Sequence, residues 1–164
     1  MAGMPTDAIR EHLARALDWK EAHATFDQAV EGIPPDNRGA LAPGFDHSAW
    51  QLLEHIRLAQ DDLLAFCRDA DYVHNMKWPD DYWPNAPAPP DAAAWDASVR
   101  GYKQGVDAFR RLIRETSDLA APVPTGKPSQ THLRSILLLI DHTAYHLGQI
   151  VDLRRALGIW SPAA

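Results

Sequence analysis

Two histidines lie four residues apart near the end of the sequence, in the segment IDHTAYHLGQIVDLRRALG, residues 140–158. In a helix this spacing places His142 and His146 on one face, with Cβ atoms about 5–6 Å apart. Two imidazole nitrogens can then converge on one divalent ion. The pair alone is a weak signal, because histidines that belong to the core or the surface also occur at this spacing.

A third ligand has to come from another helix. His55 is the candidate, since it lies in the middle of the helical segment WQLLEHIRLAQDDLL, between the apolar positions Leu52 and Ala59. A buried histidine satisfied by a hydrogen bond is the alternative interpretation. Three histidines from two helices would leave part of a metal ion's coordination sphere open for water or substrate, as in catalytic sites.

Ligating imidazoles usually donate their second N–H to an oriented acceptor. Asp62, two turns beyond His55 on its own helix, and Gln149, on the face of His146, are candidates for this role or for contacts to substrate. Asp141 is a weaker candidate, because it lies about 100° around the helix from its neighbour His142. Its alternative role is a surface or interhelical charge pair.

Other metal sites fit the sequence less well. A metalloprotease HExxH motif needs a glutamate after the first histidine, where this chain has Thr143. A di-iron bundle needs a glutamate or a Glu-x-x-His pair on each of its helices, and here Glu54 is the one glutamate beside a candidate histidine. We interpret the other five histidines as surface residues: His12, His23, His47, His74 and His132.

Four helical segments must position these residues, because apolar residues recur at helical spacing in four parts of the chain. Thr6 or Asp7 is a suitable N-cap for the first helix and Asp91 for the third, and Gly158 ends the fourth. The predicted helices span residues 6–33, 48–68, 91–113 and 131–157. The sequence thus predicts an all-α protein, a four-helix bundle whose facing helices can build a site.

A long segment separates the second and third helices and reads DADYVHNMKWPDDYWPNAPAPPDAA. It has five prolines from Pro79 to Pro90, and the large aromatic residues Trp78, Tyr82 and Trp83 lie in or beside this stretch. Loops of this length are uncommon in compact domains unless they cover a site or are disordered, and the aromatic residues argue against disorder. We expect Trp78 and Trp83 to pin this loop onto the bundle, with a lid or interface role as an open alternative.

Bulk properties narrow the class of protein. A chain of 164 residues that is 46% hydrophobic is expected to form one domain, residues 1–164. Its longest apolar run covers residues 136–140, so we expect a soluble, cytoplasmic protein without membrane partners. The single cysteine, Cys67, fits a reducing compartment and a buried position. A net charge of −6 argues against nucleic acid as a partner.

Four stretches resemble the DinB/YfiT-like superfamily of metal-dependent enzymes: DHSAWQLLEHIRLAQ, WPDDYWP, AWDASV and DHTAYHLGQIVDLRRALG. The resemblance extends over essentially the whole chain. Its most specific part is the pattern HxxxHxGQ combined with a histidine on an earlier helix.

The resemblance implies an up-up-down-down four-helix bundle, often a homodimer, with His55, His142 and His146 as ligands of a divalent ion such as zinc or nickel. Relatives act as thiol S-transferases with bacillithiol or mycothiol-like thiols, or as isomerases and hydrolases. It therefore implies a metal-dependent enzyme that activates a low-molecular-weight thiol or water for a small-molecule substrate. It does not imply DNA binding.

Two alternatives remain open from the sequence. The chain could be a non-catalytic, stress-associated dimeric bundle in which an ion joins the second and fourth helices, or the three histidines could be metal-free core residues. The number of protein ligands discriminates between a metal-dependent enzyme and the non-catalytic bundle, because structural zinc sites usually have four protein ligands.

Overall fold

The computed structural model describes residues 5–160. All of its regular elements in this range are helical, and an isolated β-bridge pairs Pro122 with Thr131. The α-helices are α1 (Pro5–Ala16), α2 (Phe26–Val30), α3 (Ala49–Arg68), α4 (Ala92–Glu115) and α5 (His132–Ala156), and two 3₁₀ helices are η1 (Pro35–Asn37) and η2 (Asp80–Tyr82). No helix in the described range is both long and apolar enough to cross a bilayer.

Side-chain caps determine where the three long helices begin. Ser48 and Gln51 form a reciprocal capping box at the start of α3. Asp91 at α4 and Thr131 at α5 each accept a hydrogen bond from the backbone N–H three residues later. The predicted boundaries of these helices are therefore confirmed, and Gly158, with a φ of 70°, follows the end of α5.

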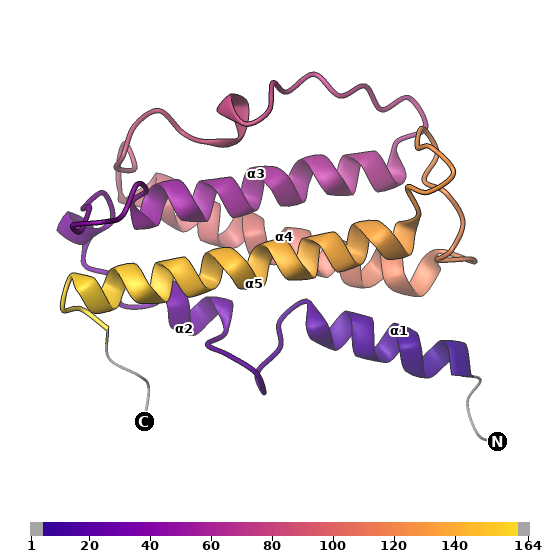
Figure 1. Ribbon diagram of the computed structural model, residues 1–164, viewed down its shortest axis with the longest axis horizontal. Helices are drawn as coiled ribbons and strands as arrows, with labels where there is room; N and C mark the ends of the chain where they lie inside the picture. Colours follow the sequence, from indigo (N-terminus) through magenta and orange to yellow (C-terminus); the bar gives the residue numbers. More distant parts are fainter. Residues whose placement is uncertain (1–4, 161–164) are drawn as a thin grey trace.

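The four main helices form a bundle, as the sequence predicted (Figure 1). α3 and α4 run in the same direction and are joined by the long crossover loop, residues 69–91, while α1 and α5 run the opposite way. In chain order, α1, α3, α4 and α5 therefore run up, down, down and up. The order up-up-down-down, which the resemblance implied, is wrong. Because α3 and α4 are parallel, the chain has to run back along the bundle from the end of α3 to the start of α4, and the crossover loop makes this return.

The N-terminal region is the largest departure from prediction. The sequence predicts one helix over residues 6–33, but the structure has α1 and the short α2 with residues 17–25 between them. Thr25 and Gln28 form a capping box that begins a new helix, and the residues before it are mostly exposed. α1 already begins at Pro5, so Thr6 and Asp7 lie in its first turn.

The core lies between α3, α4 and α5. Gly105 of α4 leaves room for the buried side chain of Gln60 on α3, because a Cβ at this position would lie 2.1 Å from the terminal amide of Gln60. Burial of each large aliphatic or aromatic side chain contributes about 1.5–3 kcal/mol. The largest fully buried hydrophobic side chains include Leu53, Ile56, Phe109, Ile113, Ile136 and Ile150. This packing gives α3 and α5 fixed positions relative to each other.

Candidate metal centre

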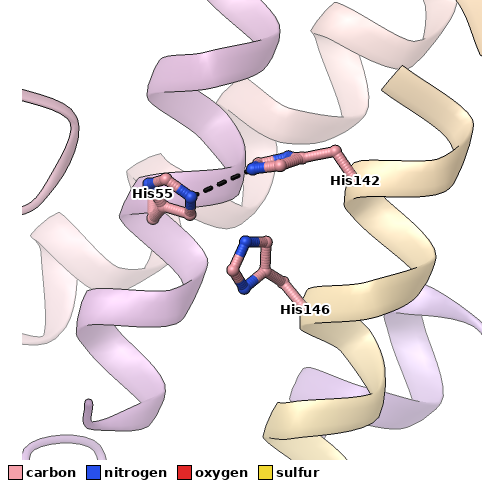
Figure 2. Close-up of side chains that lie close together, drawn as sticks. All are labelled: His55, His142 and His146. Carbon is pink, nitrogen blue, oxygen red and sulfur yellow. Dashed lines mark hydrogen bonds between the residues drawn. The ribbon is translucent and has the colours of Figure 1, made fainter. Parts of the chain in front are cut away.

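The three candidate histidines lie together in the structure. His55 comes from the middle of α3 and is buried, while His142 and His146 come from successive turns of α5. One ring nitrogen from each can be chosen so that all three lie within 4.8 Å of one another. Figure 2 shows the three rings turned toward one another across the gap between the two helices.

His55 is oriented by the crossover loop. Its Nδ1 lies 3.0 Å from the backbone carbonyl of Tyr82 in η2. A carbonyl can only accept, so Nδ1 carries the hydrogen and Nε2 keeps its lone pair. His55 therefore presents to the cluster the nitrogen that a metal ion would bind.

His146 is oriented by its own helix. Its Nδ1 lies 2.6 Å from the Oε1 of Gln149, three residues later. With the hydrogen on Nδ1, Nε2 is free to act as a ligand. Gln149 is therefore in direct contact with a candidate ligand.

His142 has a different environment. Its Nε2 lies 3.0 Å from the Nε2 of His55, and Figure 2 shows this contact as a dashed line. Because Nε2 of His55 carries no hydrogen, Nε2 of His142 has to donate in the metal-free protein. Ligation by this nitrogen would move the hydrogen of His142 to Nδ1.

Burial keeps the cluster uncharged. It lowers the pKa of His55 and of His142 from the usual 6.5 to about 4, and the neighbouring histidines act in the same direction. The pKa of His146 is also lowered, mainly by burial. All three rings are therefore neutral at pH 7, which is the form that binds a metal ion.

The crossover loop follows a polar face of α3. Ser48, Gln51 and His55 all contact carbonyl groups of the loop. Their spacing of three and four residues puts them on one side of the helix. The carbonyls belong to Pro87, Pro84 and Tyr82, respectively.

Asp62 continues this face of α3 and fastens the same loop. Its carboxylate accepts hydrogen bonds from the hydroxyl of Tyr72, at 2.7 Å, and of Tyr82, at 2.5 Å. Burial and the charge of Asp62 raise the pKa of both hydroxyl groups, so they remain donors. Asp62 thus acts on His55 through Tyr82, whose carbonyl is the acceptor of the imidazole, rather than by touching a candidate ligand.

An aromatic stack covers His55 on the loop side. The ring of Trp83 lies 3.8 Å from that of His55 and 3.8 Å from that of His47, nearly parallel to both. Trp83 pins the loop as predicted. The same expectation for Trp78 is wrong, because this residue is 66% exposed. Tyr82, which is 5% exposed, is the loop residue that packs against the bundle instead.

Sequence reasoning missed the position of His47. We expected a surface residue, but the ring is half-buried against Trp83 and its Nδ1 is buried. The side chain precedes the N-cap of α3, so helical periodicity gives no information about its direction. The one available signal was its place beside the helix that carries His55.

The remaining polar candidates have simpler environments. His132 is half-buried rather than on the surface, with ring nitrogens 3.2 Å from the carbonyls of Ala121 and Cys67, because the first turn of α5 packs against the end of α3. Asp141 is exposed. Cys67 is buried as expected, which raises the pKa of its thiol. His12, His23 and His74 are exposed, as predicted.

The donor set fits a divalent ion such as zinc. Zinc binds imidazole nitrogen at about 2.0–2.1 Å, so the nitrogens of one site lie about 3–3.5 Å apart. The separation of 3.0 Å between His55 and His142 and the limit of 4.8 Å for the set are close to this requirement. Within residues 5–160 the cluster consists of these three side chains, without a fourth histidine, cysteine or carboxylate.

Comparison with protein-family models agrees with the family resemblance found in the sequence. The model of the DinB superfamily matches residues 18–150, which include most of the chain and all three histidines. The chain belongs to the DinB superfamily. Comparison with curated proteins gave no match. Membership in the DinB superfamily, together with the three-histidine cluster, suggests a metal-binding protein and leaves its reaction open.

Proposed function

We propose that this DinB-superfamily protein is a metal-dependent enzyme in which His55, His142 and His146 hold one divalent ion, zinc or nickel. The observation that carries the proposal is the convergence of three neutral imidazoles from two helices, without a fourth protein ligand within residues 5–160. When bound, such an ion is a Lewis acid that lowers the pKa of a small thiol or of water and so supplies a nucleophile at neutral pH.

The residues of the chain prepare this chemistry. Tyr82 and Gln149 fix the hydrogens of His55 and His146 on Nδ1, which directs the lone pairs of both rings into the cluster. Trp83 covers one face of His55 and limits the access of water from the loop side. In the transferase version, the thiolate sulfur forms a new bond to an electrophilic carbon, and the leaving group departs with the bonding electron pair.

The second candidate is a non-catalytic metal-binding bundle. It is favoured by the origin of the ligands, because an ion shared by α3 and α5 would also cross-link two core helices. Metal binding alone does not distinguish the two candidates. Turnover of a substrate does.

The first test is elemental analysis of protein purified without chelator, compared with His146→Ala. We expect about one zinc or nickel ion per chain in the wild type and loss of that ion in the variant, since two nitrogens hold the ion far less tightly than three. His12→Ala is the matched control, because His12 is exposed on α1. Absence of metal from the wild type, or equal metal in His146→Ala, would overturn the metal site.

The second test is a screen of small thiols with a model electrophile such as 1-chloro-2,4-dinitrobenzene, alongside ester and amide hydrolysis assays. We expect turnover by the metal-loaded wild type and its loss in His146→Ala. A metal-loaded protein without turnover in either assay would favour the non-catalytic bundle.

A further inference from the structure

A cavity of about 770 Å³ lies at the C-terminal end of α5. Its walls come from the segment between α1 and α2, from α2 itself, which lies beside α5 (Figure 1), and from Arg154, Ile159 and Trp160. The volume is within the range of small-molecule sites. The candidate metal ligands do not line this cavity, and Arg154 lies two turns beyond His146, about 12 Å along the axis of α5.

Arg154 brings a buried charge to the wall of the cavity. It is only 4% exposed, and although burial lowers its pKa, a guanidinium stays protonated at neutral pH. The charged group itself lies at the wall, because three lining residues contact it. The backbone carbonyls of Gln28 and Ile159 accept hydrogen bonds from it, and the ring centroid of Trp160 lies 4.9 Å from its Cζ.

These contacts leave one edge of the guanidinium without a partner. Nη1 donates to the carbonyls of Gln28 and Ala29, each at 2.8 Å, and Nη2 lies 3.4 Å from that of Ile159. Nε is buried and has no acceptor among the residues that the structure describes. Trp160 provides a cation–π attraction but no acceptor of the carbonyl kind. A charged donor that is buried without an acceptor destabilises the protein, so this edge lacks an acceptor.

The charge of Arg154 lacks a counter-charge as well. In the described part of the chain all ion pairs join other residues, and carbonyl groups are neutral. Among the other charged residues of the lining, Glu21 pairs with Arg15 at 2.6 Å, whereas Lys20 and Glu31 are exposed and belong to none of these pairs. Two cationic groups therefore face one carboxylate, which favours an anionic ligand.

We propose that this cavity binds the carboxylate of a small organic acid at Arg154, with the apolar part of the acid against Trp160 and Ile159. The Nε–H and the adjacent N–H of Nη2 are parallel donors that match the two oxygens of a carboxylate. Such a ligand supplies both the acceptor and the negative charge, whereas a water molecule supplies the acceptor alone. The inference concerns a second site and does not depend on the proposed function.

An NMR titration of ¹⁵N-labelled protein with phenylacetate tests this assignment through the indole N–H signals. Trp160→Phe and Trp83→Phe identify the signals of the cavity and of the metal centre, respectively. We expect phenylacetate to move the signal of Trp160 and to leave that of Trp83, which stacks on His55, unchanged.

Two further probes define the chemistry of the ligand. Phenylacetamide, which has the same shape without the charge, is expected to bind at least tenfold more weakly. Phenyl phosphate matches the same donors, but its second negative charge is unfavourable beside Glu31, so we expect it to bind no more tightly than phenylacetate.

Two variants test the residues that carry the proposal. Arg154→Lys keeps the positive charge but lacks the parallel donors, and it is expected to weaken phenylacetate about tenfold. Because Arg154 also joins α5 to α2, the second variant is Glu31→Gln at the exposed rim, which removes a repulsive charge and is expected to strengthen phenylacetate about threefold. Glu115→Gln, an equal charge change at the exposed end of α4, is the matched control and should leave the affinity unchanged.

The outcomes decide the assignment even if Arg154→Lys does not fold. A shift of the Trp160 signal with phenylacetate, together with the expected difference between Glu31→Gln and Glu115→Gln, supports it. Equal affinities for phenylacetate and phenylacetamide, absence of binding, or equal affinities for the two glutamate variants would overturn it. A shift of Trp83 without Trp160 would place the acid at the metal centre, and tighter binding of phenyl phosphate would replace the carboxylate by a phosphate; either result overturns the proposal.

Discussion

α3 and α5 hold their histidines in two different ways. On α5, His146 is oriented by Gln149 from the next turn of the same helix. On α3, His55 is oriented by the carbonyl of Tyr82, which is 27 residues away in the crossover loop. The α5 half of the site thus forms with its helix, whereas the α3 half is complete only when the loop has packed onto the bundle.

This difference explains why the loop is fastened along its length. Ser48, Gln51 and Asp62 each bind the loop at a point that helps to fix the Tyr82 carbonyl. A loop of this length would otherwise retain conformational freedom, and His55 would lose its acceptor. The crossover loop is therefore part of the candidate site rather than a connection alone.

The largest expected effect comes from removing the aromatic stack of the loop. Trp83→Ala leaves a gap between His47 and His55 and should lower the free energy of unfolding by about 3 kcal/mol. Trp78→Ala, in the same loop but 66% exposed, should change it by less than about 0.5 kcal/mol. Urea denaturation measures both, and similar losses for the two variants would contradict the assignment of Trp83 as the residue that pins the loop.

The next effect concerns the attachment of the loop to α3. Asp62→Ala removes the acceptor of two tyrosine hydroxyls and releases the Tyr82 carbonyl, so metal affinity should fall about 30-fold. Asp61→Ala is the matched control, because Asp61 is the preceding residue and pairs with Arg57. Calorimetric titration with zinc gives the affinities. Equal affinities for the two variants would show that α3 holds His55 without help from the loop.

A third prediction concerns the dependence of stability on pH, to which His55 on α3 and His142 on α5 contribute in the same direction. The folded-state pKa of His55 and of His142 is about 4, below the usual 6.5, so the unfolded chain binds more protons between these values. Stability of the metal-free protein is therefore fully present above pH 6.5 and falls toward pH 4, by on the order of 2 kcal/mol.

Urea denaturation at pH 7, 5.5 and 4.5 measures this loss. His55→Gln should reduce the dependence on pH, whereas His12→Ala, an exposed control, should leave it unchanged. A stability that is constant across this range would contradict burial of neutral rings.

The smallest expected effect is on the α5 side. Gln149→Leu removes the acceptor of one imidazole without disturbing the loop, and metal affinity should fall about tenfold. Gln149→Glu keeps an acceptor and should restore the affinity. If Gln149→Leu weakens binding more than Asp62→Ala does, the relative importance of the two halves of the site is reversed.

The candidate ligands and most of the helices could be predicted from the sequence. His142 and His146 share a face by spacing alone, and the caps Ser48, Asp91 and Thr131 lie where the helices begin. Membership in the DinB superfamily, which the sequence already suggested, is confirmed by the match over residues 18–150. These features depend on interactions within a few residues, which a pattern can represent.

The N-terminal region shows where such patterns fail. Apolar residues continue at roughly helical spacing through residues 17–25, yet the capping box of Thr25 begins a separate helix. In the loop, Trp78 and Trp83 are equivalent as sequence, but only the second contacts the rings of His47 and His55. Where a helix ends and which tryptophan becomes buried depend on the part of the folded protein against which each segment packs.

Residue type and helical spacing, read from the sequence alone, indicated which side chains could bind a metal ion and which helices carry them, and the resemblance to the DinB superfamily singled out His55, His142 and His146. The tertiary structure decided that His55 meets the α5 pair, that a backbone carbonyl of Tyr82 orients it, and that Arg154 is buried at the wall of a cavity. A backbone carbonyl has no residue type to recognise, and contacts between distant segments depend on packing. For that reason the environment of the site became visible only in the folded chain.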